Sequence, residues 1–230
     1  MSVLTENAAV TRVTPNGGRE AASRPLLREH RLTFCLDGEP WASTVCTREY
    51  LEQLVLGRLC TSGRIRRRED LVSLRFTEDE TRAEASLRPG QEPGAPRRLT
   101  DKSSWGSGDI FRLAAYLKRS MPLHDDTYST HGCLLLHRGE VLCCREDIGR
   151  HNAIDKAVGE ILLRGLPPEE CVLYTTGRVS AEIAEKAVTA GIPVLVSRTL
   201  PTLEAVEFAR ERGLTLIGRA WEEQYEVFAD

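Results

Sequence analysis

The stretch CCREDIGRHNAIDKAVG, residues 143–159, gathers thiols, acids, arginines, a histidine and an asparagine directly before a helical repeat. His151 and Asp155 are spaced i and i+4, so they lie on one side of a helix, and we expect them to meet at the rim of a pocket. The plainer alternative is that His151 is a structural histidine. Cys143 and Cys144 point to opposite faces of a predicted strand, which predicts neither a simple disulfide nor a two-ligand metal site.

The same stretch also has the features of an ordinary helix start. Glu146 and Asp147 precede the helix and suit its positive N-terminal end. One apolar stripe follows at helical spacing and predicts a face packed in the core. Its members are Ile154, Ala157, Val158, Ile161 and Leu162. Residue types alone therefore leave both interpretations open, a chemical site and a helix start.

Three loops rich in arginine and hydroxyl residues follow the last three predicted strands, at 175–180 (TTGRVS), 197–202 (SRTLPT) and 218–224 (GRAWEEQ). Glycine lets a backbone approach a ligand, arginine supplies charge, and helix N-termini favour anions. Because the carboxyl ends of parallel strands meet at one sheet edge, we expect one anion-binding crevice, although ordinary turns and caps would look alike. The candidate residues are Gly177, Arg178, Ser180, Arg198, Thr199, Thr202 and Arg219.

The order of predicted elements places these loops on a sheet covered by helices. A helix is expected over residues 109–121, a hairpin over 133–144 and a further helix at about 150–164. Beyond it, strands at 171–175, 193–197 and 214–218 alternate with helices at 180–190 and 202–212. Apolar strands separated by helices predict a parallel sheet with helices packed against it.

The first hundred residues predict a tail and a small α+β unit. Residues 1–27 show no periodicity and contain PNGG, so we expect a disordered tail. A hairpin about a D-G turn, a helix over 48–62 and a second hairpin then make a small unit at 28–100. That unit ends in a linker at 88–100, because three prolines and two glycines break regular structure there. Residues 101–230 form the second predicted domain.

Composition excludes several function classes. The chain has 230 residues, of which 41% are hydrophobic and 28% charged, as in ordinary globular proteins. The net charge is only -3, with basic residues scattered among 34 acids, so nucleic acid is not expected as a partner. No apolar run approaches the ~18 residues that a membrane span needs, and no signal-peptide core is present, so we expect no membrane association and a cytoplasmic location. The seven cysteines form no C-x-x-C pair, which favours core thiols.

A hairpin, a helix that opens with a histidine, and a strand–helix repeat resemble the cytidine deaminase fold. That family binds zinc through a His or Cys-x-Glu sequence on one helix and Pro-Cys-x-x-Cys on the next. Here residues 151–153 read HNA and residues 176–180 read TGRVS, which lack the glutamate and both thiolates. The expected fold class is therefore α/β, with a small N-terminal α+β unit and a cytidine-deaminase-like three-layer α/β/α domain without zinc.

The motifs match a second family more closely. DGEPWAST, GRLCTSGRI, REDIGRHNAIDKAVG and the run from TTGRVS to LTLIG resemble the formate dehydrogenase accessory sulfurtransferase (FdhD) family over about residues 29–228. REDIGRHNAIDK fits the family pattern R-E-D-(V/I)-G-R-H-N-A-x-D-K at every fixed position. The resemblance implies a homodimer that holds molybdenum bis(molybdopterin guanine dinucleotide) in a GDP-like pocket. Sulfur would pass to that cofactor from a cysteine desulfurase before the cofactor enters formate dehydrogenase.

This chain departs from the family at several functional positions. The family carries sulfur as a persulfide on a cysteine of C-G-x-C-G, where this chain reads SSWGSGD, with Trp105 and Gly108 at the cysteine positions. The T-G-G-x-H segment becomes TYSTH, and F-A-R-G-D-R becomes RAWEEQ. The usual persulfide is thus lost, and tight pyrophosphate binding is expected to weaken. The implied cofactor-binding positions are His131, His151, Gly177, Arg178, Ser180, Arg198, Thr199, Arg219, Ala220, Trp221, Glu222, Glu223 and Gln224.

Three classes of function follow from these residues. The leading expectation is an FdhD-like accessory protein that binds the cofactor without the usual persulfide cysteine. Cys133, two residues after His131, is either a replacement thiol or a plain core residue. The alternative is a non-enzymatic guanine-nucleotide-binding or regulatory module. A zinc hydrolase or deaminase would instead contain stoichiometric zinc.

Overall fold

The computed structural model describes residues 4–89, 94–96, 98–100 and 105–230. Its largest sheet has six strands in the order β12-β11-β10-β9-β7-β8. The strands are β7 His131–His137, β8 Glu140–Asp147, β9 Cys171–Thr175, β10 Val194–Ser197, β11 Thr215–Gly218 and β12 Glu226–Ala229. β9, β10 and β11 run parallel, whereas β7 pairs antiparallel with β9. The α/β fold class predicted from the sequence is confirmed.

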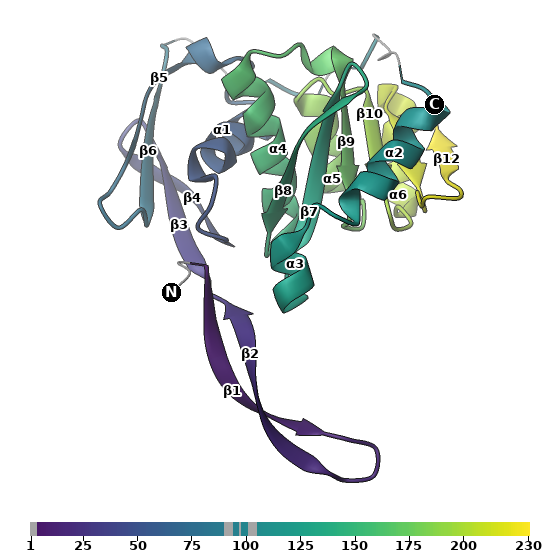
Figure 1. The fold of residues 1–230 in the computed structure, drawn as a ribbon. Coiled ribbons are helices and arrows are strands. Elements are labelled where there is room, and N and C mark those ends of the chain that lie inside the picture. Colours follow the sequence, from purple (N-terminus) through teal and green to yellow (C-terminus); the bar gives the residue numbers. More distant parts are fainter. Residues whose placement is uncertain (1–3, 90–93, 97, 101–104) are drawn as a thin grey trace.

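Helices cover both faces of this sheet (Figure 1). α2 Ser107–Leu117 packs on one face. The opposite face carries α4 Arg150–Arg164, α5 Ala181–Thr189 and α6 Leu203–Arg212. Successive residues of β7 show the layering, because Leu134 lies in the core under α2 while Cys133 and Leu135 lie in the core under α4. The strands read as apolar runs because both of their faces are buried.

A second sheet of four strands, in the order β4-β3-β6-β5, lies beyond α1 (Figure 1). These elements are β3 His30–Leu36, β4 Glu39–Cys46, α1 Leu51–Thr61, β5 Leu71–Phe76 and β6 Arg82–Leu87. Asp37 and Gly38 both have positive φ, which the tight β3–β4 turn requires. α1 packs against α4, and the buried residues of both form one continuous hydrophobic core with the small sheet.

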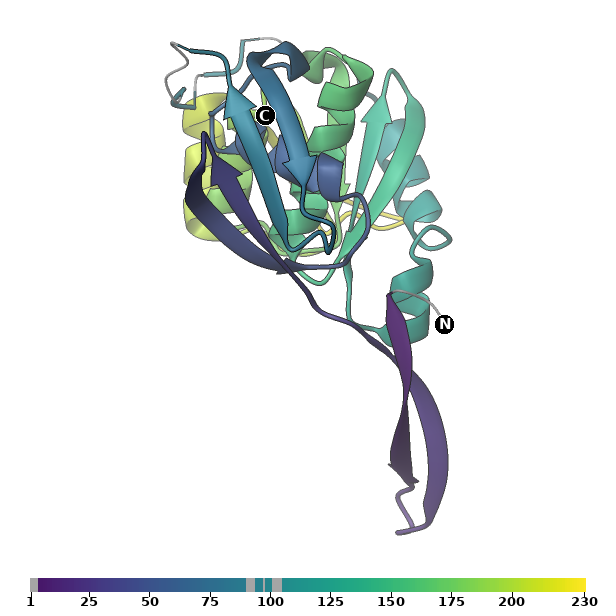
Figure 2. The same ribbon diagram turned by 90° about the vertical axis from the view of Figure 1, so that its left-hand side faces the viewer.

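Residues 5–27 form a two-stranded antiparallel ribbon, so the prediction of a disordered tail is wrong. β1 Thr5–Val13 and β2 Arg19–Leu27 project away from the body (Figures 1 and 2). The turn between them contains PNGG, and Gly17 adopts a φ of 82°. The ribbon has no apolar alternation because neither of its faces is packed on the core, so the pattern that predicts a half-buried strand is missing.

The remaining differences lie at short elements and at the predicted linker. A short helix, α3 Pro122–Thr127, and the edge strand β12 were not expected. Within the linker at 88–100, residues 90–93 and 97 lie outside the described part of the chain. The Gly94 N–H donates to the Gly63 carbonyl at 2.9 Å, and the Leu99 N–H donates to Arg212 at 2.8 Å. No helix of the described residues is long and apolar enough to span a membrane.

Candidate functional site: a cleft at the carboxyl edge of the sheet

The loops that follow β9, β10 and β11 are tied together by hydrogen bonds, as the parallel sheet predicts. The Arg198 N–H donates to the Thr175 carbonyl at 3.1 Å, and the Arg219 N–H donates to Thr199 at 3.1 Å. The Ser197 hydroxyl donates to the Gly177 carbonyl at 2.9 Å. These bonds give the three loops one shared edge on which a ligand can rest.

A cleft of about 480 Å³ opens at this edge. β7 runs antiparallel to the parallel strands, so its first residue, His131, reaches the same edge as their last residues. α3 and the residues after it form the opposite wall. The lining residues are Met121, His124, Tyr128, Ser129, Thr130, His131, Thr176, Arg198, Thr199 and Trp221. The volume lies within the range typical of small-ligand sites.

Arg198 and Trp221 contact each other in the lining of this cleft. The guanidinium of Arg198 lies 4.3 Å from the centroid of the Trp221 ring, which is a cation–π contact. Both side chains also line a neighbouring cavity of about 270 Å³ that includes Glu222 and Glu223. Among the described residues, Arg198 makes no ion pair with a carboxylate. Its charge therefore remains available to an anion bound in the cleft.

His131 presents a neutral ring to the cleft. The imidazole is half-buried, and this burial lowers its pKa below the ordinary value of 6.5. The charge of Arg150 nearby lowers that pKa further. At pH 7 His131 is therefore neutral, with one ring nitrogen as donor and the other as acceptor. The second histidine of the cleft, His124, is oriented by a 2.9 Å contact between its Nδ1 and the Thr130 carbonyl.

Several predicted loop residues lie outside the cleft lining. Arg178 is exposed and makes no ion pair among the described residues. Ser180 precedes α5 without a side-chain cap, while Thr202 caps α6 by accepting the Ala205 N–H. Arg219 pairs with Glu226 at 3.3 Å instead of facing the cleft.

Three further predicted residues make contacts that shape the loops: Gly177, Ala220 and Gln224. A Cβ at Gly177 would lie 2.8 Å from the Cβ of Arg150, so this glycine permits the β9 loop to contact the start of α4. Ala220 is buried, and its carbonyl accepts the Tyr174 hydroxyl at 2.7 Å. The Gln224 carbonyl accepts the Trp221 N–H at 2.8 Å, which closes the loop that carries Trp221.

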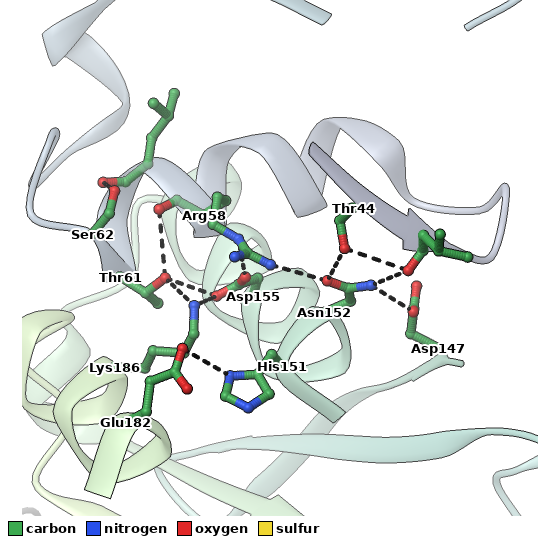
Figure 3. A network of polar contacts seen from close by, with 12 residues as sticks. Thr44, Arg58, Thr61, Ser62, Asp147, His151, Asn152, Asp155, Glu182 and Lys186 are labelled. Carbon is green, nitrogen blue, oxygen red and sulfur yellow. Dashed lines mark hydrogen bonds and ion pairs between the residues drawn. The ribbon is translucent and has the colours of Figure 1, made fainter. Parts of the chain in front are cut away.

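The polar side chains of REDIGRHNAIDK mostly serve the packing of α4 (Figure 3). Asp155 is fully buried and lies between α1 and α5. Its carboxylate lies 2.7 Å from Arg58 Nε and 2.8 Å from Lys186 Nζ. It also accepts the Thr61 hydroxyl at 2.7 Å. One buried carboxylate therefore joins three helices.

His151 does not meet Asp155, and the expectation that they share a pocket rim is wrong. His151 Nδ1 instead lies 3.7 Å from the Glu182 carboxylate on α5 (Figure 3). Burial lowers the pKa of His151, as it does for His131. The carboxylate of Asp155 is turned toward the cations of Arg58 and Lys186, which offer closer and charged partners. His151 is also absent from the lining of the cleft.

A second buried pair fixes the turn before α4. Lys156 Nζ lies 2.6 Å from Asp147 Oδ2, and both side chains are fully buried. Asp147 also accepts the Gly149 N–H at 2.9 Å, the Asn152 amide at 2.9 Å and the Thr47 N–H at 3.0 Å. The motif therefore starts the helix and ties it to the end of β4. It supplies no reacting group to the cleft lining.

Glu146 links this motif to the cleft indirectly. Its carboxylate accepts the Leu123 and His124 N–H groups at 3.0 Å and 2.8 Å, together with the Thr130 hydroxyl at 2.7 Å. These bonds hold α3, which carries His124 into the cleft wall. Pro122 at the first position of α3 is the sequence signal that could have revealed this helix.

Cys133 is fully buried on β7, and burial raises its pKa well above the ordinary thiol value. Its role as a replacement sulfur carrier is therefore not supported, because a carrier needs an accessible thiolate. Trp105 is half-buried and packs on the core under α2, and Gly108 lies in the first turn of α2. Residues 103–104 of SSWGSGD lie outside the described residues. Among those described, no three His, Cys, Asp or Glu side chains gather as metal ligands.

The fold is that of an α/β protein, and its candidate ligand site is a cleft lined by loops at the carboxyl edge of the sheet. The chain belongs to the FdhD/NarQ family, which matches residues 27–108 and 91–230. The sulfur carrier protein FdhD of Halalkalibacterium halodurans is 31% identical over 83% of this chain and 81% of its own. The Bacillus subtilis sulfur carrier protein FdhD is 29% identical over 84% of both chains.

A solved structure extends the similarity to three dimensions. The crystal structure of a formate dehydrogenase accessory protein from Desulfotalea psychrophila superimposes with a TM-score of 0.85 at 26% identity. It covers 99% of this chain and 97% of its own, a span that includes the projecting ribbon.

Proposed function

We propose that this chain is an accessory protein for formate dehydrogenase maturation that holds the guanine dinucleotide form of the molybdenum cofactor. Membership of the FdhD/NarQ family, and similarity to a sulfur carrier protein FdhD and to a formate dehydrogenase accessory protein, support the accessory role. The observation that carries the proposal is the 480 Å³ cleft, whose lining includes Arg198, a guanidinium that makes no ion pair among the described residues.

The residues of the cleft fit one nucleotide portion of such a cofactor. Arg198 and the hydroxyls of Thr176 and Thr199 are suited to a phosphate, and the Trp221 ring is suited to a planar base. Neutral His131 can donate or accept a hydrogen bond there. The cleft volume accommodates a nucleotide, so the larger pterin parts would extend beyond it. When bound, the cofactor supplies the molybdenum centre on which the client enzyme depends.

Sulfur transfer through the usual loop does not belong to this proposal. Neither the indole of Trp105 nor the hydrogen of Gly108 can carry a persulfide, so a cysteine desulfurase finds no acceptor thiol at these positions. The proposed activity is cofactor binding and delivery to formate dehydrogenase. The same loss favours the second candidate, a guanine-nucleotide-binding regulatory module. We place either activity in the cytoplasm, where free thiols such as the seven cysteines here stay reduced.

Thermal melts test whether the cleft binds GDP, and AMP and cytidine serve as control ligands. At about 100-fold excess over the dissociation constant, binding to the native state alone adds about 2.7 kcal/mol, which raises the midpoint by several degrees. Arg198→Ala should weaken GDP binding by about 1.5–3 kcal/mol, because it removes a charged hydrogen-bond donor. Arg75→Ala, an exposed arginine of β5, is the matched control and should bind GDP like the unaltered chain.

The outcomes separate the possibilities. A shift with GDP that Arg198→Ala abolishes supports nucleotide binding in the cleft. A shift of equal size in Arg198→Ala would place the nucleotide elsewhere, and no shift with any nucleotide would contradict cofactor binding. Restoration of formate dehydrogenase activity in a cell that lacks its own accessory protein distinguishes the maturation role from the regulatory module.

A further inference from the structure

A second cavity, of about 230 Å³, lies at the edge of the six-stranded sheet opposite the cleft. It is enclosed by the end of α1, the turn after α5, the segment before β9 and described residues within 94–99. Because β9 and β10 start beside this cavity, it lies at their amino ends, whereas the cleft lies at their carboxyl ends. No described residue lines both, so an occupant of this cavity leaves the cleft open.

The floor of this cavity is apolar and buried. Cys60, Ile65, Val188 and Ala190 line it, and each is 8% exposed or less. An apolar group placed against these residues leaves water, which favours binding. α1 and α5 both end at the cavity, so the negative ends of two helix dipoles lie there. The floor therefore favours an apolar group over a carboxylate.

Backbone hydrogen bonds hold the walls of the cavity in place. The Gly63 N–H donates to the Cys60 carbonyl at 2.9 Å, and the Gly94 N–H donates to the Gly63 carbonyl at 2.9 Å. Gly63 has a φ of 74°, and a Cβ there would lie 2.2 Å from the Gly94 carbonyl oxygen. Glycine thus permits the turn after α1 to contact residue 94. Because the cavity is already formed, a partner does not have to order it on binding.

Two arginines supply the charge of the lining. Arg66 and Arg98 are exposed, and neither pairs with a carboxylate in the described part of the chain. The carboxylate of Asp70 instead accepts the backbone N–H of Arg66 at 2.8 Å and lies 3.2 Å from Arg67 Nε. The described lining contains no Asp, Glu or aromatic residue. Two guanidinium groups beside an apolar floor can therefore bind carboxylates of another molecule.

We propose that this cavity docks an acidic segment of a partner protein, with one aliphatic side chain on the floor and flanking carboxylates paired with Arg66 and Arg98. The volume favours a single side chain, because pockets for whole small ligands start at about 300 Å³. A buried apolar anchor beside arginines is the arrangement of binding hot spots in protein interfaces. Nucleic acid fits less well, since the described lining offers no aromatic ring on which a base could stack.

The position of this docking site separates it from ligand binding in the cleft. The two lie at opposite edges of one sheet, so a partner protein and a cleft ligand can be held at the same time. The docking site does not depend on the identity of the cleft ligand. GDP should therefore leave binding of the acidic segment unchanged.

Fluorescence anisotropy with labelled peptides tests the docking site on the full chain. The leucine peptide is Gly-Glu-Asp-Leu-Asp-Glu-Gly, and we expect it to bind with a Kd below about 1 mM. Binding should weaken as salt rises, because exposed charges are screened. The alanine peptide, with Ala in place of Leu, should bind about tenfold more weakly, since it lacks most of the apolar anchor. A peptide with lysines in place of its acids should not bind.

Variants of the lining separate the charged rim from the apolar floor. Arg66→Glu/Arg98→Glu should weaken binding of the leucine peptide at least about tenfold, because like charges then face each other. Arg75→Glu, at an exposed arginine of β5, is the matched control and should bind like the unaltered chain. Thr189→Phe, at a half-buried position of the lining, fills the cavity and should bind the leucine and alanine peptides equally. Circular dichroism checks that each variant is folded.

Several outcomes would overturn the proposal. They are no binding of the leucine peptide, equal affinity of the unaltered chain for the leucine and alanine peptides, unchanged binding in Arg66→Glu/Arg98→Glu, and displacement of the peptide by GDP. A labelled thymidine oligonucleotide tests the other class of partner. If it binds more tightly than the leucine peptide and loses affinity in Arg66→Glu/Arg98→Glu, the two arginines serve nucleic acid and the proposed protein partner is wrong.

Discussion

Gly57 on α1 and Gly159 on α4 are the points where these two helices touch backbone to backbone. A Cβ added at Gly57 would lie 1.7 Å from the carbonyl oxygen of Asp155, whereas ordinary contacts lie at 3.4–4 Å. Helix propensity alone predicts that Gly57→Ala raises the free energy of unfolding by about 1 kcal/mol. Overpacking opposes this gain, and the neighbouring atom is backbone that cannot rotate away. We therefore expect a net loss of about 3 kcal/mol.

Urea unfolding followed by circular dichroism measures this change directly. Gly159→Ala, whose Cβ would lie 1.9 Å from the Gln53 carbonyl, should lose a similar amount. Gly108→Ala on α2 is the control, because a Cβ there meets no atom within 4 Å, and it should change the unfolding free energy by less than about 1 kcal/mol. If the unfolding free energy of Gly57→Ala equals that of the unaltered chain, the close contact between α1 and α4 does not hold the small N-terminal unit and the six-stranded domain together.

Two further predictions concern buried charge. Asp155→Asn should lower the unfolding free energy by about 3–5 kcal/mol in the same urea assay, because Lys186 loses its buried partner. The control is Glu182→Gln, an exposed position beside His151, which should lower the unfolding free energy by less than about 1 kcal/mol. Equal losses in the two variants would contradict the buried network. The lowered pKa of His131 means that the unfolded chain binds its proton more readily, so stability is complete above pH 6.5 and falls as the pH drops through the folded pKa. His131→Gln should flatten this fall below pH 6.5, and an unchanged slope would assign the pH dependence to other groups.

Local periodicity predicted the elements that are packed on a core. The strand at 171–175 matches β9, and the helix at 150–164 matches α4. The ribbon of β1 and β2 escaped prediction because its side chains face solvent on both sides, so no apolar pattern marks it. β12 is short, and its exposed Glu226 and Val227 give no strand alternation. Hydrophobic periodicity does not mark a helix or strand whose side chains are exposed, because burial does not restrict which residue types occur there.

The sequence by itself determined which segments become the strands and helices that pack on a core, and that three arginine-bearing loops meet at one sheet edge. It also carried the FdhD/NarQ pattern and the loss of the loop cysteines at Trp105 and Gly108. Only the tertiary structure decided which polar groups pair. Asp155 binds Thr61, 94 residues earlier in the chain, while His151 turns to Glu182. Spacing within one helix cannot encode such partners, because they come from other helices and are selected by burial, charge and close packing.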